Sequence, residues 1–469
     1  MTTNEERKKD ENSVSLLHDN TVAPRDDRKA RGLVLRGVVP YLSHSGWSPA
    51  HDRPDPVELL QLSDRGRIPE LVQIRYGRML KTPFTFYRGA ANVMARDLAT
   101  TPATGVRVQL CGDCHALNFG AFATPERNVS FDIVDFDETL PGPWEWDLKR
   151  LTASLVLLAR DNSISPADAR ASAEAAARAY REKMAEFARM SILDIWYAHF
   201  DWENVVAQVS GHGLKKDLQD CLKKAQKRSI QHYYFPKLTH SQHGKQVITD
   251  DPPLIYHAKD DKEFADRMGR GLQLYRESLQ GDKRRLIDRY QLCDIAIKVV
   301  GVGSVGTTCA VALFMSGDNE PLFLQLKEAR KSVLEEHAGK SPFQSHGQRV
   351  VEGQRIIQSA SDLFLGWFKL DDGKHFYVRQ LRDTKVKLVT DHWEGQHLID
   401  MAGMMGAVLA RAHARSGDSA IITGYLGKSE MFDRAVADFS VLYADQVEKD
   451  YAALAAAVRA GRIQAQTDI

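Results

Sequence analysis

The chain has 469 residues, of which 43% are hydrophobic and 27% charged, and its 63 lysines and arginines nearly balance its 62 aspartates and glutamates. The net charge of +1 excludes an overall electrostatic attraction to nucleic acid or to a membrane surface, so neither is expected as a partner and any phosphate binding must be local. This length suits two or three domain-sized units, or one two-lobed unit with additions.

The cysteines and the N-terminus bear on the compartment. There are five cysteines, an odd and sparse set. The chain opens MTTNEERKKDENS, which lacks the apolar stretch of a secretory signal, and it contains no run of 18 apolar residues. These features are typical of a reducing compartment, so we expect a cytoplasmic location.

The first part of the chain is predicted to be mostly helical. Residues 1–35 are dense in charge of both signs and poor in aromatics, which predicts a disordered or loosely held arm. Residues 36–290 are predicted to form a helical lobe that carries a catalytic loop and a metal-binding strand. The helices expected within this lobe cover residues 56–81, 84–99, 144–162 and 166–194.

A short strand at 106–111 leads into the loop GDCHALN, in which Asp113 and Asn118 have the spacing D-x-x-x-x-N. In phosphoryl transfer a carboxylate accepts the proton of the attacking hydroxyl group, and an amide oxygen five residues later can hold a metal. Asp113 is therefore the candidate general base, and Asn118 is a candidate catalytic residue and metal ligand. By itself the spacing also fits turn-forming residues.

Seventeen residues after Asn118, a second strand ends in the run IVDFDE, which contains Asp135 and Asp137. A carboxylate at a strand end is well placed to bind magnesium that bridges nucleotide phosphates. We expect Asp135 to be the catalytic metal ligand and Asp137 to assist it. The next helix carries Asp147, which can brace the loop by accepting backbone N–H bonds.

The composition changes near residue 291, and a β-rich lobe is expected over 291–390. The segment GVGSVG places Gly301, Gly303 and Gly306 in G-x-G-x-x-G spacing, with Ser304 among them, and glycines let backbone N–H groups approach phosphate oxygens. A dinucleotide-binding fold needs a helix after the third glycine. The following TTCAVALFM favours a strand instead, which predicts the nucleotide-covering hairpin of kinases. A plain hairpin with bulges is the alternative.

The next strand, LFLQLK, ends in Lys327, where a kinase has the lysine that grips the nucleotide phosphates. The following helix holds Glu352, the expected partner of Lys327, with Glu335 and Glu336 as rivals. Lys327 can instead be an exposed strand-end lysine, and Glu352 a solvated helix residue. The glycine segment, Lys327 and Glu352 are together predicted to form the ATP-binding part of the site.

The two halves come in reverse order, because a kinase has its glycine loop and lysine before its catalytic aspartate. A circular permutation accounts for this, with residues 391–469 as the helical completion of the large lobe. The succession G-D-x-H-x-x-N, D-F-D and a helix with W-D-L resembles the aminoglycoside-phosphotransferase and choline-kinase branch of the kinase-like fold. Cys111 departs from the histidine that is usual at this position in that branch.

Several runs also resemble, in the same order over roughly residues 30–460, the bacterial family named domain of unknown function 2252. These runs include TPFTFYRGAANVMARDLA, CGDCHALNFGAFATPER, FDIVDFDETLPGPWEWDLKRL, GVGSVGT, FLQLKEA and HGQRVVEGQR. The resemblance implies no particular substrate. Arg88, His413, Arg415 and Asp418 lie in matching runs, and Arg88 or Arg415 could bind a phosphate or an anionic substrate.

Cys111 and Cys114 allow other interpretations. The run C-x-x-C-H fits c-type haem attachment, and two thiols can begin a zinc site or form a redox pair. The motif occurs once and the other cysteines are isolated, so buried packing is the favoured interpretation.

The predicted fold is therefore α+β: a two-lobed, protein-kinase-like fold in permuted order, with a small β-rich nucleotide lobe and a large helical lobe. The predicted function is phosphotransfer that depends on ATP and magnesium, with a small molecule or a protein as substrate. The alternatives are AMP transfer, or nucleotide binding without catalysis. A non-enzymatic scaffold would leave Asp113, Asp135 and Lys327 far apart.

Overall fold

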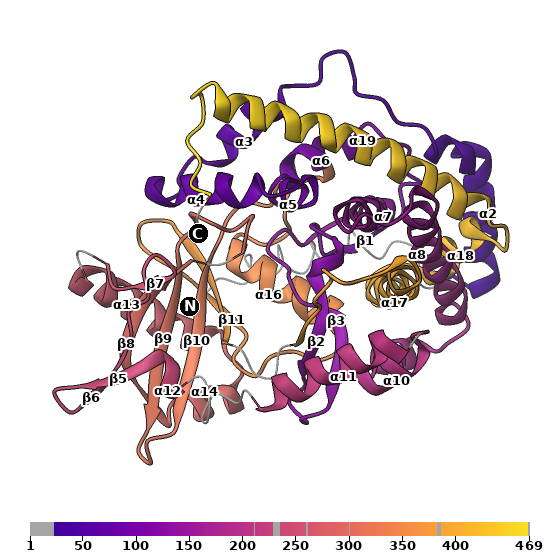
Figure 1. The fold of residues 1–469 in the computed structure, drawn as a ribbon. Coiled ribbons are helices and arrows are strands. Elements are labelled where there is room, and N and C mark those ends of the chain that lie inside the picture. The colour runs from indigo at the N-terminus through magenta and orange to yellow at the C-terminus, as the bar shows by residue number, and fades with distance from the viewer. Residues whose placement is uncertain are drawn as a thin grey trace.

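The computed structural model describes residues 23–210, 212–227, 235–258, 261–299, 301–381 and 386–467. A large antiparallel sheet lies beside a larger helical region, as Figure 1 shows. The predicted α+β class is confirmed at this level. None of the described helices combines the length and the apolar content that a membrane crossing requires.

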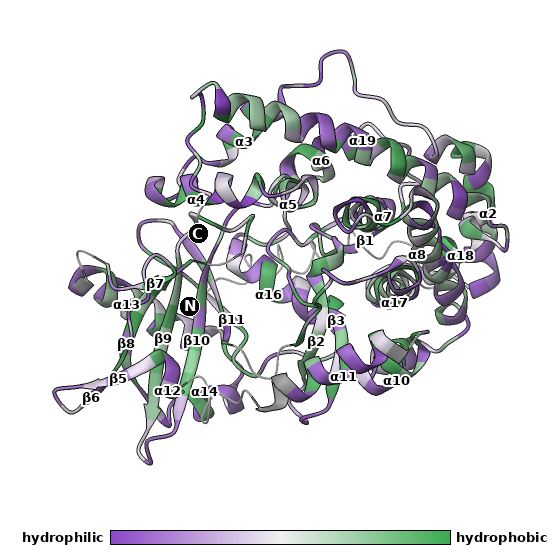
Figure 2. Cartoon of the chain, in the orientation of Figure 1, coloured by the Kyte–Doolittle hydropathy of each residue, from purple (hydrophilic) through white to green (hydrophobic). Residues whose placement is uncertain are grey.

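The large sheet has six strands in the order β11-β12-β10-β9-β8-β7, and each neighbouring pair is antiparallel. Its strands are β7 Ile255–Tyr256, β8 Tyr290–Lys298, β9 Cys309–Ser316, β10 Pro321–Ala329, β11 Gly366–Lys369 and β12 His375–Gln380. Figure 2 shows hydrophobic residues along β9 and β10, which are buried at nearly every position. The central strands therefore form because both of their faces are covered.

Helices cover this sheet at close range. They are α13 Asp261–Ser278, α14 Gly281–Ile287 and α16 His346–Ile357, whereas the short helix α15 Glu335–Ala338 packs on β4 Leu140–Pro143 of a separate sheet. A Cβ atom on Gly271 of α13 would lie 2.3 Å from the Phe368 ring on β11, and one on Gly347 of α16 would lie 2.2 Å from the Phe376 carbonyl oxygen on β12. Glycine at these two positions lets both helices approach the strands.

Smaller sheets and short helices join the two regions. The strands are β1 Arg107–Leu110 with β4 Leu140–Pro143, β2 Phe119–Ala123 with β3 Val129–Ile133 and β13 Val386–Lys387, and β5 Thr239–Gln242 with β6 Lys245–Ile248. The helices are α3 Pro56–Ser63, α4 Pro69–Met79, α5 Pro83–Gly89, α6 Ala91–Leu98, α9 Ile192–Tyr197, α10 Trp202–Gln208, α11 His212–Lys227 and α12 Phe235–Leu238, with the 3₁₀ turns η2 Tyr41–His44 and η3 Ala116–Asn118.

The helical region is centred on four long helices: α7 Trp144–Asp161, α8 Pro166–Phe187, α17 Gly395–Ala414 and α19 Met431–Arg459. Small residues let α17 and α8 pack tightly, since a Cβ atom on Gly406 would lie 2.1 Å from the Ala176 carbonyl oxygen. A buried ion pair of 2.6 Å between Arg411 of α17 and Asp132 of β3 ties these helices to the small sheet.

The predicted loosely held arm is corrected where the structure describes it. Arg25–Val38 forms helix α2, which packs on α18 Ser419–Leu426. A Cβ atom on Gly32 would lie 2.0 Å from the Ile421 carbonyl oxygen, and Arg36 donates to two carbonyl oxygens of α18 at 2.6 Å. Charged composition suggested solvation, but close backbone approach at Gly32 and Gly424 and the contacts of Arg28 and Arg36 dock the helix. Residues 1–22 of the predicted arm lie outside the described residues.

The expected lobe boundaries also shift. The sequence placed residues 36–290 in the helical lobe and 291–390 in the β-rich lobe. The large sheet already includes β7 at residue 255, and α13 packs on β11. Part of the polar stretch before residue 290 therefore belongs with the sheet. Residues 395–459 contain α17, α18 and α19, so the helical completion after residue 391 is as expected.

Candidate functional site

A cavity of about 950 Å³ lies between the large sheet and the small sheet of β2, β3 and β13. Its walls include Asn118 and Asp135 from the first half of the chain, and Gly301, Ser304 and Lys327 from the second half. Five residues that the sequence analysis named separately thus line one cavity. The scaffold alternative predicts that Asp113, Asp135 and Lys327 lie apart. Asp135 and Lys327 line this cavity together, whereas Asp113 is not among its lining residues.

The loop before the cavity is braced from α7. The carboxylate of Asp147 accepts the backbone N–H of Cys111 at 2.7 Å and that of Gly112 at 3.1 Å. Gly112 has a φ of +86°, and a Cβ atom there would lie 2.2 Å from the Glu138 carbonyl oxygen. The predicted bracing role of Asp147 is confirmed, and the turn requires glycine.

The register of the β2–β3 hairpin explains why Asn118 and Asp135 lie together. Phe119 pairs with Ile133, and the Val134 N–H donates to the Asn118 carbonyl oxygen at 2.9 Å. The side-chain nitrogen of Asn118 donates to the Asp113 carbonyl oxygen at 2.7 Å, which leaves its side-chain oxygen as an acceptor at the cavity wall. An amide oxygen and a carboxylate are ligands that suit magnesium.

Asp113 is held by an arginine that follows Asp147 along α7. Arg150 Nε donates to Asp113 Oδ1 at 2.7 Å, and the Arg150 guanidinium also lies 4.2 Å from the centre of the Tyr87 ring. Burial raises the pKa of the Asp113 carboxyl above its usual value, although the positive charge of Arg150 opposes this shift. A carboxylate with a raised pKa is the stronger base.

The glycine segment forms the loop between β8 and β9. Because β9 is a strand paired with β8, the segment is a hairpin loop, as both the kinase-type and the plain hairpin predict, and the dinucleotide fold is ruled out. Gly301 and Gly306 have φ values of +69° and +90°, which few other residues adopt. Arg78 donates to the Gly301 carbonyl oxygen at 2.6 Å, so the helical region holds this loop over the cavity.

Asp137 receives bonds from three elements of the β-rich region. Lys327 Nζ lies 2.6 Å from Asp137 Oδ2, Tyr377 donates to Oδ1 at 2.6 Å and Ser304 to Oδ2 at 3.0 Å. Burial is the largest single influence and disfavours both charges, but the charge and hydrogen bond of Lys327, the hydrogen bond of Tyr377 and the charge of Arg379 together lower the pKa of Asp137 below its usual value. In the same way Asp137 holds the pKa of Lys327 well above its usual value.

The predicted pairing of Lys327 with Glu352 is corrected. Glu352 forms an ion pair of 2.9 Å with Arg355 one turn later on α16. The cavity-facing residues of this helix are Gln354 and Gln358. Residues two apart on a helix differ by roughly 200° in direction, so Glu352 points away from the face that Gln354 presents. The rival Glu335 instead accepts the Ser332 N–H at 3.2 Å.

The remaining predicted site residues are Gly303 and Gly306. A Cβ atom on Gly303 would lie 3.3 Å from the Arg88 carbonyl oxygen, so the tip of the loop rests on the end of α5. Gly306 lies against the side chain of Arg67, and its carbonyl oxygen accepts the Ile68 N–H at 2.7 Å. Both glycines shape the loop from its outer side.

A family model described as "Uncharacterized protein conserved in bacteria (DUF2252)" matches residues 67–457. The chain belongs to this bacterial family. The matched range contains each predicted site residue from Asp113 to Glu352, and it begins at Arg67, beside the glycine loop. Neither a curated protein nor a solved structure matches the chain.

In this DUF2252 member, the sequence analysis missed three residues that shape the cavity. Arg150 lies one turn after Asp147 on α7 and so faces the same loop, a spacing that could have identified it. Tyr377 and Arg379 pair across the strands with Lys327 and Gln325. Because Tyr377 and Arg379 are two residues apart on β12, both side chains lie on the cavity side of the sheet. This could be expected only once the pairing of β10 with β12 is known.

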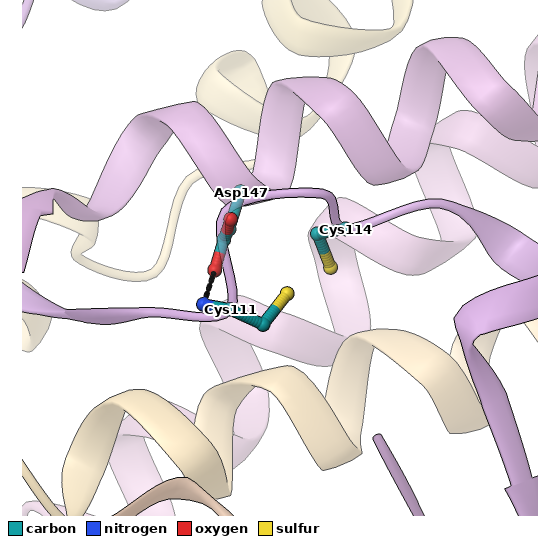
Figure 3. Close-up of side chains that lie close together, drawn as sticks. All are labelled: Cys111, Cys114 and Asp147. Atoms are coloured by element: carbon teal, nitrogen blue, oxygen red, sulfur yellow. Dashed lines mark hydrogen bonds between the residues drawn. The ribbon is translucent and has the colours of Figure 1, made fainter. Parts of the chain in front are cut away.

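Cys111, Cys114 and Asp147 offer three possible metal ligand atoms within 4.8 Å of one another, and Figure 3 shows how they lie. Both oxygens of Asp147 already accept backbone N–H bonds. Burial raises the pKa of both thiols, so each is protonated and a poor ligand. The two cysteines lie in the hydrophobic core, as the packing interpretation expects.

Proposed function

We propose that this protein is a phosphotransferase that uses ATP and magnesium, with a kinase-like site assembled in permuted order and a small molecule or a protein as acceptor. One observation carries the proposal. Asn118 and Asp135 line the same cavity as Gly301, Ser304 and Lys327, although the two groups come from opposite halves of the chain. Convergence of this kind is what phosphoryl transfer requires.

The order of elements in the large sheet supports a nucleotide-binding role. The glycine loop joins β8 and β9, Lys327 lies on the third strand of this run, and α16 follows. Protein kinases have the same succession of glycine loop, strand, strand with lysine, and helix. The helix carries no glutamate toward Lys327, and Asp137 takes that place.

The proposed metal-binding residues pass a chemical test. Asn118 offers a side-chain oxygen whose amide nitrogen is already engaged, and Asp135 offers a carboxylate on the same wall. Bound magnesium would neutralise charge on the nucleotide phosphates. Asp137 would assist after releasing Lys327, which then grips the phosphates.

In the proposed reaction Asp113 accepts the proton of the acceptor hydroxyl group. The hydroxyl oxygen forms a bond to the γ-phosphorus of ATP, while the bond between that phosphorus and the bridging oxygen breaks and ADP leaves with the electron pair. The raised pKa of Asp113 favours proton uptake, and Arg150 keeps the carboxylate oriented.

AMP transfer, or nucleotide binding without catalysis, is the second candidate. It is favoured by the ion pair between Lys327 and Asp137, which engages the lysine that ATP phosphates would need. It is favoured also by Cys111, which stands where the related kinases carry histidine.

Calorimetric titration with ATP and magnesium tests the proposal. The intact protein should bind the nucleotide, Lys327→Ala and Asp135→Ala should each weaken binding at least about tenfold, and Glu352→Ala should leave it unchanged as the matched control. Mass spectrometry after incubation with ATP and a cell extract separates the candidates by a gain of phosphate, a gain of AMP or no change. An intact protein that binds no nucleotide would rule out both.

A further inference from the structure

Arg88 is the last but one residue of α5 and lines the cavity. Its Nε is buried and has no hydrogen-bond partner among the described residues, and within that part of the chain no carboxylate oxygen lies within 4.0 Å of its guanidinium. The guanidinium instead packs 6.0 Å from the centre of the Phe84 ring. Lys327 and Arg379, which also line the cavity, both have side-chain partners: Lys327 donates to Asp137, and Arg379 donates to Gln325.

Three features of the proposed reaction surround Arg88. The tip of the glycine loop rests on it, because a Cβ atom on Gly303 would lie 3.3 Å from the Arg88 carbonyl oxygen. Asp113, the proposed base, and Asp135, the proposed metal ligand, are the two acidic groups that influence its charge. Arg88 therefore adjoins the glycine loop, and the charges of Asp113 and Asp135 favour its positive charge.

A partly buried guanidinium whose Nε lacks a partner is unfavourable, and an incoming anionic group would offset that cost. Arginine also binds phosphate oxygens with two parallel hydrogen bonds. The group that passes from the glycine loop toward Asp113 is the transferred phosphoryl group. Resting on the phosphotransferase function proposed above, we propose that Arg88 binds this γ-phosphoryl group and stabilises its charge during transfer.

This role separates nucleotides by one phosphate. ADP ends at the β-phosphate, so Arg88 contributes to the binding of ATP and not to that of ADP. Charge-assisted hydrogen bonds are worth about 1.5–3 kcal/mol, which corresponds to roughly 10- to 100-fold in affinity.

The experiment titrates the full-length protein with magnesium and either ADP or a non-hydrolysable ATP analogue, by calorimetry. Arg88→Gln should weaken binding of the analogue at least about tenfold and leave binding of ADP within about twofold. Arg88→Lys keeps a charge without the bidentate geometry, so its affinity for the analogue should lie between those of the original protein and of Arg88→Gln. It takes the place of Arg88→Gln in the experiment if that variant does not fold. Arg96→Gln, an exposed position on α6, is the charge-matched control and should change neither affinity.

Each result has a defined meaning. Equal weakening of both nucleotides by Arg88→Gln would mean that Arg88 only supports the loop, and no effect on either would mean that the phosphoryl group lies elsewhere. Both results overturn the inference while the intact protein still binds ADP. If the intact protein binds neither nucleotide, the phosphotransferase proposal itself fails and this inference fails with it.

Discussion

Lys327 Nζ lies 2.6 Å from Asp137 Oδ2, although 190 residues separate the two in the chain. The lysine belongs to the large sheet, and the aspartate follows β3 of the small sheet. Tyr377 and Ser304 donate to the same carboxylate, so three groups of the β-rich region converge on one acidic side chain. This carboxylate joins the two regions across the cavity.

Breaking this pair should destabilise the protein. Lys327→Met leaves a carboxylate that keeps two donors and some solvent, so the expected loss in unfolding free energy is about 1–3 kcal/mol rather than the full value of a buried pair. Urea unfolding measures it, and a double-mutant cycle with Asp137→Asn should show coupling of at least about 1 kcal/mol. Glu352→Gln, which breaks the half-exposed pair with Arg355, should cost less than about 1 kcal/mol. If Lys327→Met and Glu352→Gln lose similar amounts of unfolding free energy, the assignment of Asp137 as the partner of Lys327 is contradicted.

Two glycines with similar φ values provide a matched pair. Gly112→Ala meets both the strain of φ +86° and the Glu138 carbonyl oxygen at 2.2 Å, whereas Gly105→Ala at φ +80° meets no atom within 4 Å. Gly105→Ala should cost about 1–2 kcal/mol, and Gly112→Ala should cost more than about 3 kcal/mol or prevent folding. Thermal unfolding compares them, and equal effects would mean that the loop does not approach Glu138.

Asp147→Asn should loosen the loop that carries Asp113. An amide group keeps one acceptor oxygen, so only one of the Cys111 and Gly112 N–H groups retains its bond. We expect hydrogen exchange at these two amides to become at least about tenfold faster, which corresponds to a loss of about 1.4 kcal/mol in local opening. Mass spectrometry of peptides spanning residues 107–118 measures this without any assay of activity. Unchanged exchange would show that the brace is dispensable.

Lys149 gives a dependence of stability on pH. Its buried ammonium lies 4.9 Å from the Phe439 ring, and burial lowers its pKa to about 7 against the opposing charge of Glu145. The pKa of a lysine in the unfolded state is about 10.4. Between these values the unfolded state binds a proton that the folded state lacks, so this group makes stability rise with pH.

Lys149→Met removes that contribution. From pH 7 to 9 the unfolding free energy of the original protein should therefore rise relative to the variant, by up to about 1 kcal/mol per pH unit. Urea unfolding at three pH values measures the difference. Lys81→Met, at an exposed position, should show no such trend relative to the original protein. If the difference in unfolding free energy between the original protein and Lys149→Met does not change with pH, Lys149 remains charged in the folded state.

The sequence predicted those parts of the site whose contacts join residues close together in the chain. Glycine spacing followed by strand formers predicted the hairpin around Gly301, and the next helix along the chain after the acidic strand predicted the brace from Asp147. Both depend on contacts set by turn geometry and by short connections. The large sheet and the helical completion could be expected for the same reason.

Two features depended on long-range packing and were therefore missed. The partner of Lys327 is fixed by how β10 meets the strand end before Asp137, which no local pattern records. The direction of Glu352 depends on the rotation of α16 about its axis, which Gly347 sets by its close approach to β12. The docking of α2 likewise rests on Gly32, one residue in a segment whose charge suggested solvation.

The place of α17 late in the chain has a consequence for synthesis. A ribosome that has delivered only the residues up to the large sheet has not yet made the helix that packs on α8 or the arginine that neutralises Asp132. The glycine hairpin can close at that stage, but a helical bundle that lacks α17 and α19, two of its four long members, cannot. A product truncated after β13 would expose the alanine-rich face of α8 to proteases, so the helical region is complete only when the C-terminal helices have left the exit tunnel.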